Sequence, residues 1–220
     1  MRTVVFDLDG TLADTSADLL AAANVCFERL GHGALLGPSD ALTAFHGGRA
    51  MLRLGFSRLQ HPGSEEDVTR EYPALLEAYA SAIDTHTRLY PGAVAAVETL
   101  LRQGFKTAIC TNKPEALAVE LIRRLGISHL FGALTGADTF PVRKPDPTPY
   151  RAAVTRAGGL VERSILVGDT ETDRQTGLAA GVPVVLVSFG PEGEGIARLR
   201  PDALLRHFDD LPRLAAGLLP

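Results

Sequence analysis

Polar side chains follow three short apolar, β-branched runs at the point where each run ends. The first run ends in Asp7 and Asp9, the second ends in Thr111 and Asn112, and the third is followed by Asp169. Such runs are typical of buried strands. Because ligands bind beyond the carboxyl ends of the strands in an open parallel sheet, we expect these side chains to meet at one edge.

Three of these side chains, those of Asp7, Asp9 and Asp169, are carboxylates that would repel one another in a partly dry crevice. Proton uptake or a hard divalent cation would relieve the repulsion, and Mg²⁺ prefers oxygen ligands. A cation would also admit a phosphate dianion, which carboxylates alone would repel. Aspartate is a covalent nucleophile in phosphoryl transfer, and a metal ion stabilises the charge of the transition state. The residue types therefore favour a Mg²⁺-dependent reaction on a small organic phosphate.

Two further features suit the same chemistry. Lys144, in the loop segment RKPDP before an expected helix, would add a second positive centre at this edge. The hydroxyl of Thr111 and nearby backbone N–H groups would donate hydrogen bonds to the phosphoryl oxygens. Because the chain turns at Gly10, Asp7 and Asp9 would address one ligand from two sides, so that one attacks while the other protonates the leaving oxygen.

Apolar runs alternate with helical patterns along most of the chain. The expected strands are 3–8, 105–111, 164–167 and 183–187, and the expected helices are 17–30, 91–101, 114–125, 147–157, 171–180 and 211–218. This alternation predicts an α/β fold of βαβ units, with a parallel sheet covered on both faces.

Residues 39–85 interrupt that alternation, because they show only helical patterns, at 39–45, 49–60 and 65–83. We interpret this stretch as an inserted helical cap domain. The expected division is a core domain of residues 1–14 and 87–220 and a cap domain of residues 15–86. Hinges are expected near 14–16 and 85–88, where the chain crosses between the two domains.

The composition excludes several classes of function. The 220 residues carry a formal net charge of −4, so no basic surface for nucleic acid is implied. Two cysteines, Cys26 and Cys110, make neither a disulfide framework nor a CxxC metal site, which favours a reducing cytoplasm. Acidic residues occur too early for a signal peptide, and no apolar run approaches the ~20 residues that span a bilayer.

Four segments of the chain resemble, in order, the four motifs of the haloacid dehalogenase superfamily of phosphatases. They are DLDGTL at 7–12, TNK at 111–113, RKPDP at 143–147 and GDTETD at 168–173. Together they are far more specific than any one alone. The resemblance covers nearly the whole chain and implies a Rossmann-like parallel sheet with a mobile cap that closes over the substrate.

The resemblance also implies a role for each motif residue. Asp7 would be the nucleophile and Asp9 the general acid and base. Thr111, with the neighbouring Asn112, and Lys144 would hold the phosphoryl group. Mg²⁺ would be bound by Asp7, by the backbone carbonyl of Asp9 and by Asp169, with Asp173 supporting the ion through water.

Within this superfamily, the cap segment FHGGRAMLRLGFSRL at 45–59 looks like the specificity loop of phosphoglycolate phosphatases. Their usual Gly-[Asn/His]-Gly pattern is replaced here by His46-Gly47-Gly48-Arg49. Arg49 would pair with the substrate carboxylate, which its planar fork suits, and His46 and Gly48 would lie beside it. The resemblance therefore implies hydrolysis of a small phosphomonoester, with 2-phosphoglycolate as the leading substrate.

Alternatives remain open at this point. A sugar-phosphate mutase similar to β-phosphoglucomutase, or an inorganic pyrophosphatase of the same superfamily, would use the same motifs. A non-catalytic relative would be expected to lose a motif residue, and the dehalogenase branch normally lacks the aspartate that Asp9 supplies. The expected partner is a small phosphate ester, with no nucleic acid and no membrane, and the expected state is a monomer or homodimer.

Overall fold

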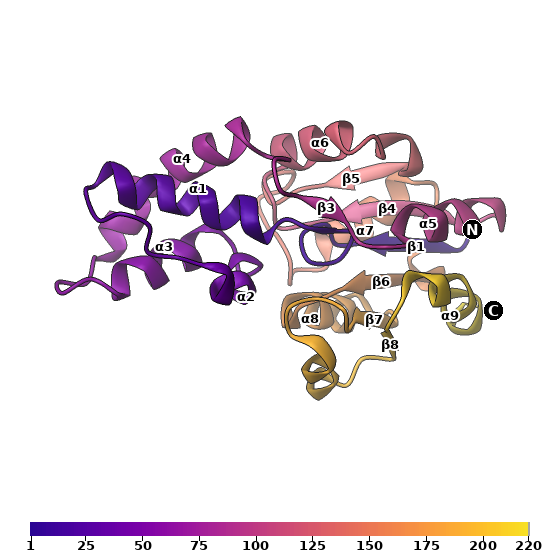
Figure 1. Cartoon of the computed structure of the whole chain (residues 1–220). Helices are drawn as coiled ribbons and strands as arrows, with labels where there is room; N and C mark the ends of the chain where they lie inside the picture. Colours follow the sequence, from indigo (N-terminus) through magenta and orange to yellow (C-terminus); the bar gives the residue numbers. More distant parts are fainter. Residues whose placement is uncertain (220) are drawn as a thin grey trace. The chain divides into compact units, whose positions relative to one another are not determined.

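The computed structural model describes residues 1–219 and divides the chain into two compact units (Figure 1). One unit is Met1–Asp14 together with the chain from Leu89 onward, and the other is Thr15–Arg88. The boundaries fall after residues 14 and 88, whereas the sequence placed them after residues 14 and 86. The first unit is called the core unit below, and the second the helical unit.

The core unit is built on a six-stranded sheet in which every neighbouring pair of strands is parallel. The strand order is β5-β4-β1-β6-β7-β8. The strands are β1 (Thr3–Phe6), β4 (Lys106–Cys110), β5 (Ala133–Thr135), β6 (Ser164–Gly168), β7 (Val184–Val187) and β8 (Ala203–Leu205). The α/β fold class is confirmed, but β5 and β8 were not among the expected strands, because three residues are too few to show a pattern.

Helices connect these strands and cover both faces of the sheet, as the complete burial of β1, β6 and β7 requires. They are α5 (Ala93–Arg102), α6 (Glu115–Arg124), α7 (Thr148–Arg156), α8 (Glu171–Ala180) and α9 (Leu211–Leu218). Helix α7 packs on β1, β4 and β5, and α8 packs on β6 and β7. Five 3₁₀ turns complete the described chain, at Pro38–Asp40, Ser128–Leu130, Val161–Arg163, Gly193–Leu199 and Phe208–Asp210.

The helical unit consists of α1 (Ser16–Arg29), α2 (Ala41–Ala44), α3 (Gly48–Ser57) and α4 (Glu65–Ser81). Its core includes Phe27 and Phe56, whose rings meet edge to face with centroids 5.2 Å apart. A side chain at Gly55 would overlap the Phe27 ring, so only glycine lets α3 approach α1 this closely. The expected helical stretch is confirmed, with ends that differ from the sequence prediction by a few residues.

The chain passes between the units at two short strands, β2 (Ala13–Asp14) and β3 (Arg88–Leu89), which pair with each other. Just inside the helical unit, the buried carboxylate of Asp18 accepts hydrogen bonds from the backbone N–H groups of His86 and Thr87 and from the Thr87 hydroxyl. None of the helices within residues 1–219 has the length and apolarity needed to cross a membrane.

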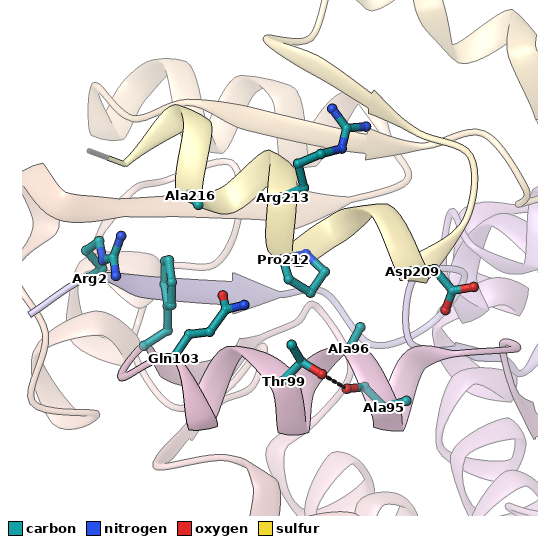
Figure 2. A pocket seen from close by; sticks show the side chains of 10 residues that line it. Arg2, Ala95, Ala96, Thr99, Gln103, Asp209, Pro212, Arg213 and Ala216 are labelled. Carbon is teal, nitrogen blue, oxygen red and sulfur yellow. Dashed lines mark hydrogen bonds between the residues drawn. The ribbon is translucent and has the colours of Figure 1, made fainter.

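A cavity of about 710 Å³ lies in the core unit between α5 and α9 (Figure 2). Arg2 and Phe105 line it, and these residues directly precede β1 and β4. The cavity therefore runs along α5, from Ala95 in its first turn to Gln103 just after its end.

Candidate active site

The three strand ends that carry the motif residues lie side by side in the sheet. β1 is the strand between β4 and β6, and Phe6 pairs with Ile109 on one side and with Val167 on the other. Asp7 leaves β1 with its N–H donating to the Val167 carbonyl at 2.9 Å. Since the connections turn to opposite sides at β1, this is the point of the sheet where a crevice forms.

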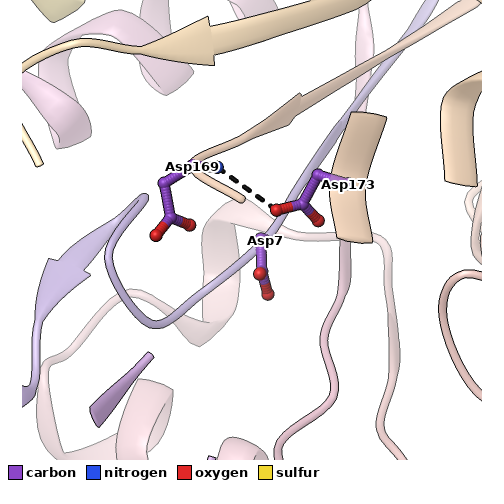
Figure 3. Close-up of side chains that lie close together, drawn as sticks. All are labelled: Asp7, Asp169 and Asp173. Carbon is purple, nitrogen blue, oxygen red and sulfur yellow. Dashed lines mark hydrogen bonds between the residues drawn. The ribbon is translucent and has the colours of Figure 1, made fainter. Parts of the chain in front are cut away.

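Three buried carboxylates converge beyond these strand ends (Figure 3). Asp7, Asp169 and Asp173 each offer one oxygen, and these oxygens all lie within 4.8 Å of one another. Asp7 follows β1, Asp169 follows β6 and Asp173 lies in the first turn of α8. The sequence prediction that Asp7 and Asp169 meet is confirmed by this geometry.

Asp173 is held by its own helix terminus. Its Oδ2 accepts hydrogen bonds from the N–H of Asp169 at 3.2 Å, from the N–H of Thr170 at 3.1 Å and from the Thr170 hydroxyl at 2.7 Å. Thr170 is the N-cap of α8, and the pair forms a capping box. The Asp173 carboxylate is therefore oriented before any ligand arrives.

Lys144 joins two of the three carboxylates. Its ammonium lies 2.7 Å from Oδ1 of Asp173 and 3.0 Å from Oδ2 of Asp7, and its side chain is 1% exposed. Burial alone would lower the pKa of Lys144, but Asp173 and Asp7 raise it above its ordinary value. The Asn112 amide donates to the Lys144 carbonyl at 3.0 Å and so ties the Lys144 loop to the end of β4.

Excess negative charge remains in this cluster. Burial raises the pKa of Asp7 from 3.8 to about 6, while Lys144 opposes this shift and Asp173 adds to it. Burial, Asp173 and Asp7 raise the pKa of Asp169 well above its ordinary value, although the Thr11 hydroxyl donates to Asp169 at 2.7 Å. One ammonium against three carboxylates leaves two negative charges, so the oxygen donor set fits a hard divalent cation.

Two glycines make this packing of carboxylates possible. A Cβ at Gly10 would lie 2.2 Å from Oδ2 of Asp169, and Gly10 also has φ +80°. A Cβ at Gly168 would lie 2.3 Å from Cγ of Asp173. Glycine is therefore required at both positions for the carboxylates to approach the backbone so closely.

Asp9 lies outside the three-carboxylate cluster, and its carboxylate pairs with the ammonium of a different lysine, Lys113. The Lys113 ammonium lies 2.9 Å from Oδ1 and 3.0 Å from Oδ2 of Asp9. The Lys113 side chain is 3% exposed, whereas that of Asp9 is 17% exposed. The two motif aspartates, Asp7 and Asp9, are thus each paired with a separate buried lysine.

The family model described as haloacid dehalogenase-like hydrolase matches residues 4–187. This chain belongs to the haloacid dehalogenase-like hydrolase family. The resemblance of its four motifs is thereby confirmed. The matched segment contains every charged residue of the site described above: Asp7, Asp9, Lys113, Lys144, Asp169 and Asp173.

Relatives within the haloacid dehalogenase-like hydrolases match along nearly their full length. The chain is 39% identical over 211 residues to the phosphoglycolate phosphatase of Mesorhizobium japonicum, covering 94% of this chain and 92% of the relative. It is 36% identical over 218 residues to that of Agrobacterium fabrum, covering 97% and 91%. A crystal structure of a predicted phosphoglycolate phosphatase from Haemophilus somnus has a TM-score of 0.86 at 24% identity and covers 97% of both chains, which shows the fold.

Three of the expected site residues, Arg49, Gly48 and His46, lie in the helical unit. Arg49, in the first turn of α3, donates to the Thr69 hydroxyl at 3.1 Å, and its guanidinium lies 4.6 Å from the centroid of the Tyr72 ring. Gly48 is the first residue of α3, and His46 is exposed in the preceding turn. A role of these three residues toward substrate stays a prediction.

Sequence reasoning missed three residues that organise this hydrolase site: Thr11, Lys113 and Thr170. Thr170 had a local signal, since a threonine three residues before an aspartate at a helix start is a capping pattern. Lys113 had a weaker one, because it follows Thr111 and Asn112 and so lies at the same strand end. Thr11 lies within the DLDGTL motif, but nothing in the sequence identified its partner Asp169, which is 158 residues away.

Proposed function

We propose that this chain is a Mg²⁺-dependent phosphatase that hydrolyses a small phosphomonoester through a phosphorylated Asp7. The observation that carries the proposal is the meeting of Asp7, Asp169 and Asp173 within 4.8 Å, beside a single buried ammonium of Lys144. The relatives are named phosphoglycolate phosphatase, which supports hydrolysis of a phosphate ester, and the family is one of hydrolases.

Mg²⁺ would be held by Asp7, Asp169 and the backbone carbonyl of Asp9, with Asp173 supporting it through water. When bound, it screens the carboxylates from the phosphoryl oxygens and stabilises the transition-state charge. Asp173 suits a supporting role, because its two oxygens are already engaged by Lys144, Thr170 and the backbone.

Asp7 is oriented for attack. Its Oδ1 accepts the N–H of Leu8 at 2.7 Å, and its Oδ2 lies 3.0 Å from the Lys144 ammonium. In the first step an Asp7 oxygen bonds to phosphorus, the bond from phosphorus to the leaving oxygen breaks, and the Asp9 proton passes to that oxygen. In the second step Asp9 takes a proton from water, the water oxygen bonds to phosphorus, and the Asp7 carboxylate is released.

Thr111, Asn112 and Lys144 would contact the phosphoryl group. Lys144 supplies positive charge at the nucleophile, and Thr111 directly follows β4, the strand next to β1. The Asn112 amide already donates to the Lys144 carbonyl, so its contribution includes holding Lys144 in place.

The proposed substrate is 2-phosphoglycolate. Two relatives at 39% and 36% identity, matched over more than nine tenths of this chain, are named phosphoglycolate phosphatase. The helical unit would act as a mobile cap, with hinges near 14–16 and 85–88, and would present Arg49 to the substrate carboxylate. A cytoplasmic location and a monomeric or homodimeric state complete the proposal.

The test is release of inorganic phosphate from a panel of small phosphate esters, with Asp7→Asn as the matched blank. We expect Mg²⁺-dependent turnover that is fastest on 2-phosphoglycolate, reversible loss of activity on chelation, and a loss of at least ~10³-fold in Asp7→Asn, which keeps the shape of the side chain. Retained activity in Asp7→Asn would refute the nucleophile. A product that is an isomeric sugar phosphate would favour the mutase, and a preference for pyrophosphate would favour the pyrophosphatase.

A further inference from the structure

We propose that Lys113 is a positioning residue that holds the Asp9 carboxyl group where its proton reaches the leaving-group oxygen. This inference rests on the proposed phosphatase function. It assigns a separate role to each buried lysine of the site. Lys144 pairs with Asp7, the proposed nucleophile, and Lys113 pairs with Asp9, the proposed acid and base.

The backbone of Lys113 is fixed on both sides. Its N–H donates to the Thr111 hydroxyl at 3.2 Å, and its carbonyl accepts the N–H of Ala137 at 2.9 Å. The next residue is Pro114, the N-cap of α6, whose ring restricts the chain further. The lysine side chain therefore starts from a rigid point at the end of β4.

The backbone of Asp9 is equally constrained. It lies in a tight turn in which the Leu8 carbonyl accepts N–H groups from Leu12 at 3.0 Å and Ala13 at 3.1 Å, and the Gly10 N–H donates to the Ala13 carbonyl at 2.9 Å. Two rigid backbones 104 residues apart in sequence thus face each other across the β1–β4 strand pair. The ammonium between them contacts both Asp9 oxygens almost equally, at 2.9 and 3.0 Å, which restricts rotation of the carboxyl group. This contact suits the ionised carboxylate that remains once the proton has passed to the leaving oxygen, so Lys113 also favours that transfer.

The choice of lysine at this position is unusual for the chain. Of its 22 basic residues only three are lysines, at positions 106, 113 and 144, and the other 19 are arginines. Lys113 and Lys144 are both buried at the catalytic edge. Burying an ammonium is costly unless it is closely paired, and Lys113 meets this condition through its contact with both Asp9 oxygens.

A positioning role makes a prediction that a structural role does not. The proton from Asp9 matters when the leaving group is an alkoxide, as in 2-phosphoglycolate and ethyl phosphate. It matters little for 4-nitrophenyl phosphate, whose leaving group departs as a stable anion. Since kcat/KM reports only the steps through phosphorylation of Asp7, it isolates the acid step from the later attack of water.

The experiment measures kcat/KM of wild type and Lys113→Met on these three esters with saturating Mg²⁺. We expect a fall of at least ~10-fold for 2-phosphoglycolate and ethyl phosphate, within the ~10²–10⁴-fold range of general acid catalysis, and a fall under ~3-fold for 4-nitrophenyl phosphate. Lys113→Arg, which can still contact both Asp9 oxygens, should keep the wild-type ratio between ethyl and 4-nitrophenyl phosphate. Lys106→Met, which removes a half-buried lysine at the start of β4, is the control.

Two results would overturn the inference. Equal falls on all three esters would show a structural or general electrostatic role. A fall confined to 2-phosphoglycolate and expressed in KM would show that Lys113 binds the substrate carboxylate instead. Circular dichroism and thermal unfolding check that each variant folds, and Lys113→Gln replaces the methionine variant if that one does not. Wild type that hydrolyses none of the esters would refute the proposed function itself.

Discussion

The Lys144 ammonium lies 2.7 Å from Oδ1 of Asp173, and both side chains are almost completely buried. The two residues come from different segments, the loop before α7 and the first turn of α8. The same ammonium lies 3.0 Å from Asp7, so Asp173 helps to fix the ammonium group that faces the proposed nucleophile. Asp173 is therefore expected to affect the reaction without contacting the substrate.

Asp173→Asn should weaken Mg²⁺ binding by about 10- to 100-fold, the usual effect of removing a group that orients metal ligands. An amide cannot accept from Lys144 and from Thr170 with the same strength, and its NH₂ group would face a donor. Isothermal titration of Mg²⁺ measures the effect. Glu171→Gln, which removes an exposed acid in the same helical turn, is the control. Equal affinities in wild type and Asp173→Asn would contradict the assignment.

Mg²⁺ binding should release protons at mildly acidic pH. Burial raises the pKa of Asp7 to about 6, so below about pH 6 this carboxyl holds a proton that a cation must displace. Burial also raises the pKa of Asp169, which adds to the effect. Apparent Mg²⁺ affinity should fall as pH falls through 6. Titration calorimetry in two buffers of different ionisation enthalpy counts the protons, and Asp7→Asn should release fewer. A proton count of zero at about pH 5.5 would contradict the raised pKa values.

The same shift affects the stability of the metal-free protein. The folded-state pKa of Asp7 is above its ordinary 3.8, so between pH 4 and 6 the folded state holds a proton that the unfolded state has lost. This carboxyl therefore favours the folded state at low pH, and its contribution is lost as pH rises through about 6. With a chelator present, we expect the difference in unfolding free energy between wild type and Asp7→Asn to fall as the pH rises from about 4 to about 6. Denaturant titrations at several pH values test it, and a flat difference would count against it.

Gly10→Ala should impair both stability and activity, and Gly104→Ala provides a matched comparison. Both glycines have φ +80°, but a Cβ at Gly104 meets nothing within 4 Å, whereas one at Gly10 meets Asp169 at 2.2 Å. Gly104→Ala should cost about 1–2 kcal/mol of unfolding free energy from backbone strain alone. Gly10→Ala should cost about 1–3 kcal/mol more through overpacking and should weaken Mg²⁺ binding. Indistinguishable variants would show that the close approach is unimportant.

Asp18→Ala should loosen the end of the helical unit. The substitution leaves the two buried donors of Thr87 and the partly buried N–H of His86 without their acceptor, at a cost of about 2–4 kcal/mol. Hydrogen exchange at the His86 and Thr87 amides should accelerate, while Glu77→Ala, an exposed acid on α4, should leave it unchanged. Unaltered exchange in Asp18→Ala would mean that these residues are held by other contacts.

The sequence predicted the longer elements of this protein well, because each combines a periodic apolar pattern with a clear end signal. Helix α8, for example, begins after Thr170 and ends at Gly181, which adopts φ +74°. Elements of two or three residues, such as β2, β3 and β5, were not predicted, because so short a segment carries no period. They form only where a neighbouring strand supplies the hydrogen bonds.

The sequence alone determined which residues share the catalytic edge. Asp7, Thr111 and Asp169 each follow a parallel strand, and the carboxyl ends of such strands meet whatever the details of packing. Only the tertiary structure decided the pairing of charges, with Lys144 beside Asp7 and Lys113 on Asp9, and the burial that raises the pKa of Asp7. Distances between side chains and exclusion of water arise from packing between distant segments, and no local pattern in the chain encodes either.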